Sequence, residues 1–268
     1  MSDAVVLTAG PAVAAPRRRS VAGDALIMIG RCVRLSRRNV DAMVTSLMLP
    51  IMLMLMFVYL FGGAINTGTR YVTYVVPGVM LLCAGFGAST TAVTVCQDMT
   101  GGIIDRLRSM DVGGGAVLGG QVAASVVRNT ASTVIVFGVA FAIGFRPHAG
   151  PLAWLGAAGI LLLFILSISW LAAAVGVAAR SPEAAGGFTF LVMFLPYPSS
   201  AFVPINTMPT WLHGFARHQP TTPVIETMRG LLLGTPVGTS PWQALAWCTA
   251  ILALSLALAT TLFRRRTT

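Results

Sequence analysis

Side chains able to perform covalent or acid-base chemistry are few in this sequence, and their spacing favours no enzyme. The basic residues are 18 arginines without a single lysine. This excludes a phosphate-binding loop of the G-x-x-x-x-G-K-[ST] type and Schiff-base chemistry. The three histidines, His148, His213 and His218, form no H-E-x-x-H pair that would hold zinc. We therefore expect no catalytic residue, no metal site and no cofactor in this chain.

The cysteines offer no alternative chemistry. Cys32, Cys83, Cys96 and Cys248 show no C-x-x-C spacing, and each lies in or beside an apolar stretch. This pattern favours neither a disulfide framework nor a zinc site. We interpret them as buried, inert thiols, because free cysteine packs as a small apolar side chain.

Three ionisable residues remain as candidates. Arg128 falls within an apolar stretch, where a charge is costly and often functional. We favour a structural role at the cytoplasmic mouth of a membrane span, with the side chain reaching toward water. Glu226 and Arg229 are three residues apart, so they are expected to pair on one face of a short helix.

The elements that position these residues are apolar helices. Hydrophobic residues make up 56% of the sequence and charged residues 10%, against roughly 25% charged in soluble domains. Residues 1–20 are polar and are predicted to be a disordered tail, and 21–268 form a single transmembrane domain. We predict an all-α membrane protein with six transmembrane helices, each long enough to cross a bilayer. Their ranges are 42–61, 71–96, 124–145, 152–179, 184–203 and 242–263.

The arginines predict the orientation of these spans. With the N-terminus inside, 14 of the 18 arginines are cytoplasmic, and Arg70, Arg146, Arg217 and Arg229 are outside. The net charge of +10 therefore indicates membrane orientation and not a nucleic-acid partner. We predict a multi-pass protein of a bacterial plasma (inner) membrane with both termini in the cytoplasm. Arginine in place of lysine, with abundant Ala and Gly, is typical of a high-G+C bacterial genome.

Two amphipathic segments are predicted on the cytoplasmic side. Between residues 22 and 38 the arginines share one helical face opposite apolar residues, which is typical of a helix in the membrane interface. A basic turn that only fixes orientation is the alternative. The connection 97–123 carries Ile103, Ile104, Leu107 and Met110 at helical spacing and reads as a short surface helix. The arginines of the interface helix are Arg31, Arg34, Arg37 and Arg38.

The external connection before the last span is too apolar for a solvated loop. Two proline-bounded segments, 210–219 and 224–234, present Trp211, Leu212 and Phe215 on one and Val224 and neighbouring residues on the other. Such faces need cover from protein or lipid, since exposed irregular backbone is not tolerated at membrane depth. We predict a re-entrant or interfacial helix pair.

Four prolines interrupt the predicted spans. Pro50 lies in the first, Pro77 in the second, and Pro196 and Pro198 in the fifth. Each removes a backbone donor and favours a kink. Packing kinks are the preferred interpretation, and the alternative is a broken helix with a moving or lining role.

A series of short motifs runs along most of the chain in a fixed order. Together they resemble the membrane subunit of a type-2 ABC exporter, the group that includes daunorubicin-type drug-resistance permeases and polysaccharide-export permeases. The matching segments are Leu60-Phe-Gly-Gly-Ala-Ile65, Tyr71-x-x-Tyr-x-x-Pro-Gly78, Gly102-Ile-Ile-Asp-Arg-Leu-Arg-Ser-Met110, Leu118-Gly-Gly120, Phe202-Val-Pro-x-x-x-Met-Pro-x-Trp-Leu212, His218-Gln-Pro-Thr-Thr-Pro223 and Glu226-x-x-Arg-Gly-Leu-Leu232.

The resemblance implies a permease that works with a separate cytoplasmic ABC ATPase, which binds ATP and Mg²⁺, and with a second permease subunit in a homodimer or a paralogous heterodimer. The cargo would be a lipophilic drug-like compound or a cell-envelope lipid or glycan. The absence of lysine agrees, because this chain cannot supply the phosphate-binding loop. The implied ATPase-coupling segment comprises Gly102, Ile103, Ile104, Asp105, Arg106, Leu107 and Arg108.

The resemblance also implies site residues in the membrane. The first, second and fifth spans would line the translocation path, with Phe57, Tyr74, Phe194 and Tyr197 as the implied residues. Trp211, Glu226 and Arg229 would belong to the external helix pair.

One segment departs from the family's pattern. Asp111-Val-Gly-Gly114 stands where the family usually has a Pro-x-Ser-Arg-like turn, so the turn is more flexible and less basic. Two other functions stay open from the sequence. One is a membrane-embedded enzyme using His213, His218 and Glu226, and the other is a passive channel or scaffold without ATP coupling.

Overall fold

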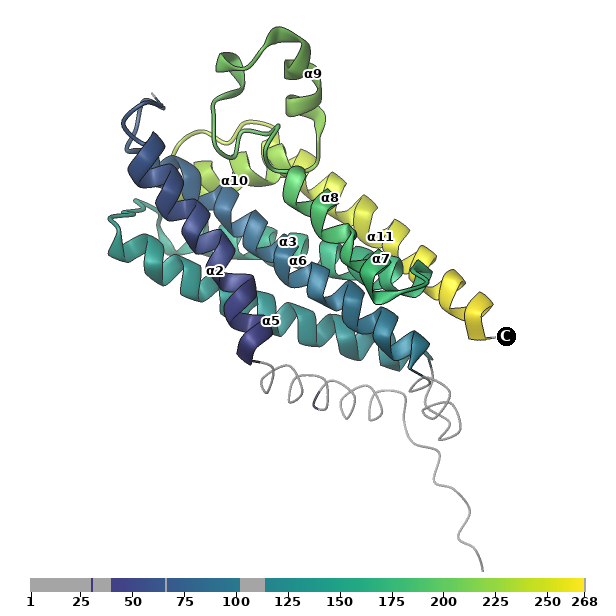
Figure 1. Cartoon of the computed structure of the whole chain (residues 1–268). Coiled ribbons are helices and arrows are strands. Elements are labelled where there is room, and N and C mark those ends of the chain that lie inside the picture. The colour runs from purple at the N-terminus through teal and green to yellow at the C-terminus, as the bar shows by residue number, and fades with distance from the viewer. Residues whose placement is uncertain (1–29, 31–39, 66, 102–113, 268) are drawn as a thin grey trace, which may run out of the picture.

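The computed structural model describes residues 30, 40–65, 67–101 and 114–267, and within these ranges every regular element is helical (Figure 1). The helices run roughly along one direction and form an elongated bundle. The elements are α2 (Val40–Met56), η1 (Phe57–Phe61), α3 (Tyr71–Thr100), α5 (Gly114–Ala142), α6 (Pro151–Ala178), α7 (Pro182–Gly186), α8 (Phe188–Phe194), η2 (Ile205–Thr207), α9 (Thr210–His218), α10 (Thr221–Leu233) and α11 (Ser240–Thr267).

Four of these helices are long and apolar enough to cross a membrane, namely α3, α5, α6 and α11. They correspond to the second, third, fourth and sixth predicted spans. The chain is therefore a multi-pass, all-helical membrane protein in the part that the structure describes.

The first and fifth predicted spans have a different form. The first is α2 continued by the π-helical turn η1, and its apolar stretch in the described structure, Leu47–Phe61, is shorter than the other four. The fifth, 184–203, is not one helix: α7 and α8 are separated at Gly187, and turns follow α8 from Leu195. The fifth predicted span is therefore not a single helix, and the interruption that its prolines predicted coincides with the turns after α8. Pro196 and Pro198 lie in these turns, where each lacks a backbone donor for a helical hydrogen bond.

Helix α5 begins ten residues before the predicted span, at Gly114 instead of Ala124. The glycines there disfavour a helix by propensity, by about 1 kcal/mol each relative to alanine. Packing explains why the helix forms nonetheless. Val117, Leu118 and Val122 are buried in an apolar cluster with Val177 of α6 and Phe263 of α11.

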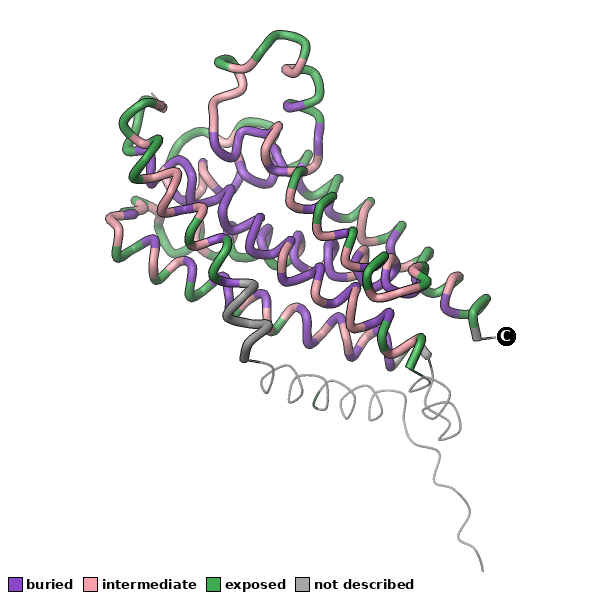
Figure 2. The backbone as a smooth tube through the Cα atoms, in the orientation of Figure 1, coloured by how far each residue is buried: buried purple, intermediate pink, exposed green. Residues whose placement is uncertain are grey.

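The core lies along α3 and α6 (Figure 2). In α3, 78% of the most apolar window is buried, whereas in α11 only 17% is. Close contacts between α3 and α6 need small residues: a Cβ atom on Gly176 would lie 2.5 Å from the carbonyl oxygen of Ala92. Small residues of this kind allow membrane helices to approach closely.

Hydrogen bonds define the two ends of the bundle. At one end, the backbone of His148 donates to Leu232 of α10 at 3.1 Å, and we call this the α10 end. At the other, the guanidinium of Arg266 donates to the carbonyls of Ala178 and Ala179, where α6 finishes, at 3.0 and 2.9 Å. We call this the Arg266 end. Helix α9 and its flanking loops project from the bundle at the α10 end (Figure 1).

Candidate functional site

The predicted cytoplasmic site residues lie outside the described residues. They are the ATPase-coupling residues Gly102 to Arg108 and the interface-helix arginines Arg31, Arg34, Arg37 and Arg38. The described ends of the neighbouring helices are joined. The side-chain amide of Gln121 on α5 donates to Asp98 on α3 at 2.6 Å. The two helices that flank the coupling segment are therefore held together next to it.

At the α10 end, five aromatic side chains form a continuous row that joins the first and fifth predicted spans. Phe57 of η1 stacks on Phe202 with ring centroids 4.4 Å apart, and Tyr197 stacks near the same residue at 5.2 Å. Phe61 extends the row beyond Phe57 at 5.5 Å, and Phe194 of α8 extends it beyond Tyr197 at 6.2 Å. We call these residues the aromatic row.

The aromatic row is buried at its centre and open at its ends. Phe202 is 2% exposed, whereas Phe61 and Phe194 are 42% and 62% exposed. Ring faces and edges of this kind bind flat apolar molecules through stacking and area burial. The row can therefore hold a lipophilic ring system but has no charged group for acid-base chemistry.

One half-buried arginine joins α3 to the turn that carries Tyr197 and Phe202. Nη2 of Arg229, on α10, donates to the carbonyl of Ser200 at 2.6 Å and to that of Tyr74 at 3.1 Å. Its guanidinium carbon also lies 3.6 Å from the centroid of the Tyr74 ring, a cation–π contact. Burial lowers the pKa of Arg229, and attraction to Tyr74 and Glu226 opposes that shift. We call this arrangement the Arg229 clamp.

Helix α3 meets the same turn through residues on one face. The Tyr71 hydroxyl donates to the carbonyl of Phe202 at 2.9 Å, and a Cβ atom on Gly78 would lie 2.7 Å from that of Ala201. Tyr71, Tyr74 and Gly78 recur at a spacing of three and four residues, so they share one helical face. The Tyr71-x-x-Tyr-x-x-Pro-Gly78 motif thus forms the face of α3 that packs against the turn at 198–202.

The structure brings together some of the implied path residues and separates others. Phe57, Phe194 and Tyr197 belong to the aromatic row. Tyr74 is 8% exposed beneath Arg229, so it supports the clamp and does not line an open surface. Phe202, at the centre of the row, was not among the implied path residues. Its place in a proline-rich segment without helical periodicity gave no signal of its contacts.

The two segments predicted to form the external pair are helices, α9 and α10, and they differ in exposure. On α10, Val224, Ile225 and Met228 are at most 1% exposed. On α9, Trp211 and Phe215 are 79% and 54% exposed, so this apolar face is not covered by the described part of the chain.

Glu226 and Arg229 do not pair, contrary to expectation. Within the described residues, Arg229 donates to backbone carbonyls, and Oε2 of Glu226 accepts from the Ser240 hydroxyl at 3.3 Å. The carbonyls that Arg229 reaches belong to distant segments, which helical spacing alone does not reveal. Glu226 instead lines a hollow of about 570 Å³ together with Arg217 and His218.

Arg128 also differs from expectation in position. Since α5 starts at Gly114, Arg128 lies near the middle of the helix and not close to its first turn. Its Nη2 donates to the carbonyl of Gly87 at 3.0 Å and to the Thr91 hydroxyl at 2.8 Å. These bonds join α5 to α3 and favour the structural interpretation.

Comparisons with known proteins agree on one family. Residues 24–233 match the family model described as ABC-2 type transporter. The chain is similar to the daunorubicin resistance ABC transporter permease protein DrrB1 of Streptomyces coeruleorubidus, at 29% identity over 86% of this chain and 81% of the relative. It is also similar to the probable doxorubicin resistance ABC transporter permease protein DrrC of Mycobacterium tuberculosis, at 23% identity over 87% of this chain and 85% of that relative.

Proposed function

The chain belongs to the ABC-2 type transporter family as a permease, and from this premise we propose that it carries a lipophilic, drug-like molecule out of the cell. The permease is not itself an enzyme, and ATP hydrolysis belongs to a separate subunit. This removes the membrane-embedded enzyme that the sequence had left open. A cell-envelope lipid or glycan is the alternative cargo.

The observation that carries the proposal is the aromatic row. Five rings in contact, with open ends at Phe61 and Phe194, offer stacking surface for a flat, apolar ring system. The relatives are named for resistance to daunorubicin and doxorubicin, and cargo of that kind suits such a surface. The row lies on the first and fifth membrane segments, which we propose line the path between two permease halves.

Coupling to ATP is proposed for the segment from Gly102 to Arg108. It emerges between the ends of α3 and α5, which the Gln121–Asp98 hydrogen bond joins. A push from the ATPase on this segment would therefore act on both helices together. The second permease half is a copy of this chain or a paralogue.

The proposed topology has six crossings, with both termini in the cytoplasm of a bacterial inner membrane. Four crossings are α3, α5, α6 and α11, and the other two are α2 with η1 and the broken segment 182–203. The basic residues at the Arg266 end support its cytoplasmic position. Residues 22–38 would then lie in the inner interface, and α9 with α10 would form the external pair around Trp211, Glu226 and Arg229.

The cargo is tested by transport in inverted membrane vesicles that contain the permease and its ATPase, with daunorubicin as the fluorescent probe. We expect ATP-dependent accumulation that falls several-fold in Phe194→Ala, because this change removes one open end of the row. Phe190→Ala is the matched control. It lies one turn away on the same helix and is 68% exposed, but it is outside the row. Equal transport by both variants would contradict a role for the row in binding cargo.

Coupling is tested in the same vesicles with the double variant Arg106→Ala and Arg108→Ala. Membrane insertion and ATP hydrolysis should persist while daunorubicin accumulation is lost, since the contact that transmits the ATPase motion is weakened. Fully coupled transport in this variant would count against the proposed segment. Accumulation that does not need ATP would favour a passive channel.

A further inference from the structure

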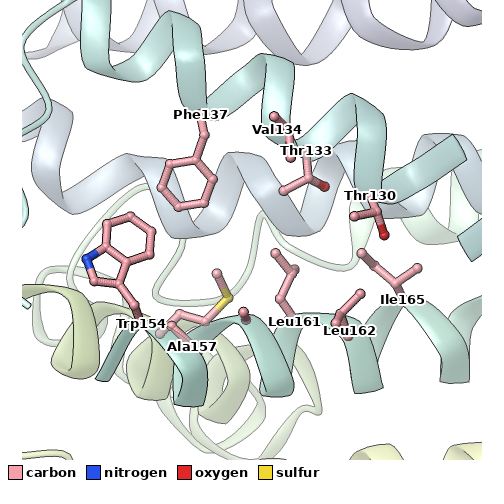
Figure 3. A pocket seen from close by; sticks show the side chains of 11 residues that line it. Thr130, Thr133, Val134, Phe137, Trp154, Ala157, Leu161, Leu162 and Ile165 are labelled. Atoms are coloured by element: carbon pink, nitrogen blue, oxygen red, sulfur yellow. The ribbon is translucent and has the colours of Figure 1, made fainter. Parts of the chain in front are cut away.

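A narrow apolar slot lies between α5 and α6, and none of its lining residues belongs to the aromatic row. Figure 3 shows side chains of α5 and α6 pointing toward one another across it. Helix α5 contributes Thr130, Thr133, Val134 and Phe137. The slot has a volume of about 240 Å³, and the surface that lines it consists almost entirely of carbon atoms.

The slot is long and confined to one half of the bundle. Along α6 it extends from Trp154, in the first turn, to Ile165. Eleven residues at about 1.5 Å each give a length of roughly 16 Å. The hydrocarbon core of a bilayer is about 30 Å thick. The slot therefore matches the depth of one leaflet, the one at the α10 end.

The slot also opens sideways toward lipid. Val134 and Leu162, on its two walls, are 65% and 43% exposed. Both residues belong to helices that cross the membrane, so hydrocarbon chains surround this opening.

Aromatic and basic residues lie where the slot reaches the α10 end of the bundle. The Trp154 ring lies 5.5 Å from that of Phe137 and 6.4 Å from that of Phe141. The guanidinium of Arg146 donates to the Phe141 carbonyl at 2.9 Å. Tryptophan beside arginine is typical of the membrane–water interface, where phospholipid headgroups lie.

We propose that this slot binds one acyl chain of a bilayer phospholipid in the leaflet at the α10 end. Its volume of about 240 Å³ is below the typical range for drug-sized ligands, which begins at about 300 Å³, so the slot suits a single chain better than a multi-ring drug. The occupant touches Met228, which lines the slot from α10 and precedes the clamp residue Arg229. A bound chain thus contacts α10 at the residue next to the clamp. The proposal depends on the membrane position of α5 and α6 and not on the exported cargo.

The test measures lipid that stays with the full chain after extraction. The protein is reconstituted in vesicles of phosphatidylcholine with brominated acyl chains, extracted in mild detergent and washed free of loose lipid. Bromine quenches tryptophan, so a version that keeps Trp154 and replaces the other four tryptophans by phenylalanine reports on the slot. Native mass spectrometry of the unaltered chain counts retained lipids independently.

Two variants fill the slot from opposite walls, Ala158→Phe on α6 and Val134→Trp on α5. Each should lose one retained lipid, and Ala158→Phe should also relieve Trp154 quenching several-fold. Leu254→Phe is the control, because Leu254 is 65% exposed on α11 and outside the slot. Elution as a single species on size exclusion checks folding. Equal retention by all variants, or no retained lipid in the unaltered chain, would overturn the proposal.

Thr133 tests the chemistry of the occupant. Its hydroxyl is buried and has no hydrogen-bond partner within the described residues. Thr133→Val keeps the shape and replaces the hydroxyl by a methyl group. Retention that is equal or greater supports an acyl chain. Loss of the lipid in this variant would mean that a polar group occupies the slot and would refute the proposal.

Discussion

Arg229 joins three segments that are distant in sequence. Its guanidinium contacts the carbonyls of Tyr74 on α3 and Ser200 in the turn after α8, while its backbone belongs to α10. Arginine suits this position because its planar group presents several donors in fixed directions. A point charge on a flexible chain would not bridge both carbonyls in the same way.

We expect Arg229→Ala to destabilise the protein by about 2 to 3 kcal/mol, as estimated for hydrogen bonds that involve a charged group. Arg229→Lys should recover only part of this loss. Arg146→Ala is the control, because Arg146 also donates to backbone carbonyls at the α10 end but is exposed. The thermal unfolding midpoint in detergent gives the measurement. A midpoint that falls no further for Arg229→Ala than for Arg146→Ala would argue against the clamp.

Gly78 lacks a side chain where α3 and the turn at Ala201 touch. A Cβ atom there would lie 2.7 Å from the Cβ and 2.9 Å from the Cα of Ala201. Gly78→Ala must therefore displace backbone, and we expect a loss of about 2 kcal/mol, within the range for an overpacked core. Unfolding in denaturant in the same detergent measures this loss.

Gly138→Ala on α5 provides the contrast. In the described structure, nothing beyond the local helix backbone lies within 4 Å of the Cβ that it would add, so helix propensity alone predicts a stability equal to or up to about 1 kcal/mol above that of the parent. If Gly78→Ala and Gly138→Ala changed the free energy of unfolding equally, the close contact between Gly78 and Ala201 would be contradicted.

Single residues were only partly predictable from the sequence. The family resemblance pointed to the path residues Phe57, Tyr74, Phe194 and Tyr197 and to Arg229 of the external pair, and each takes part in the row or the clamp. Their partners were not predictable, because Ser200 and Phe202 meet them through contacts between residues far apart in the chain. Helical spacing placed Glu226 beside Arg229, but it does not say which backbone carbonyls compete for the guanidinium.

At the scale of elements, long apolar runs were predicted well. Four spans are helices close to the expected positions because long, predominantly apolar stretches have few alternatives at membrane depth. The errors occurred where packing opposes local preference. Helix α5 extends back through glycines because Val117 and Leu118 are buried against α6 and α11. The fifth segment breaks into α7, α8 and turns. Its prolines predicted an interruption, but they gave no indication of the separate break at Gly187.

The last turn of α11 caps the end of α6. Arg266 donates to the carbonyls of Ala178 and Ala179, which α6 leaves without helical partners, and a cation favours the negative end of a helix. We expect Arg266→Ala to lower the free energy of unfolding by about 0.5 kcal/mol, as for a cation at a helix C-terminus. The effect is small because the guanidinium is exposed to water and its interaction with the helix end is screened by salt. Melting at low and high salt in detergent measures it.

Arg265→Ala is the matched control for Arg266. Arg265 is the exposed neighbour on the same turn and should have no effect at either salt concentration. If the effect of Arg266→Ala stayed the same in high salt, an electrostatic cap would not explain it.

The whole molecule has two chemically different ends, and this follows from the distribution of arginine. The α10 end carries few arginines, and one of these, Arg229, is half-buried. The Arg266 end carries the basic last turn of α11. The distribution of arginine in the sequence therefore predicts which helix ends lie at the same end of the bundle. The packing of α3 at the centre and α11 at the edge depends on side-chain contacts that hydropathy does not encode.

Cysteine labelling tests the proposed orientation. In a background without the four native cysteines, Thr67→Cys and Thr235→Cys at the α10 end should react with a membrane-impermeant maleimide in whole cells. Ser181→Cys and Arg265→Cys at the Arg266 end should react only after the membrane is opened. Labelling of Ser181→Cys in whole cells would contradict cytoplasmic termini and six crossings.

The position of α11 at the edge bears on how the chain is made. Helix α6 leaves the ribosome about 60 residues before α11, so it enters the membrane with the α11 face still open to lipid. Ser167 lies on that face, and its single hydroxyl hydrogen is within reach of two carbonyl oxygens, that of Cys248 of α11 at 2.8 Å and that of Leu163 of its own helix at 2.7 Å. The bond within α6 satisfies the hydroxyl while the last helix is still being synthesised, and biogenesis can pause there without exposing an unpaired polar group to hydrocarbon.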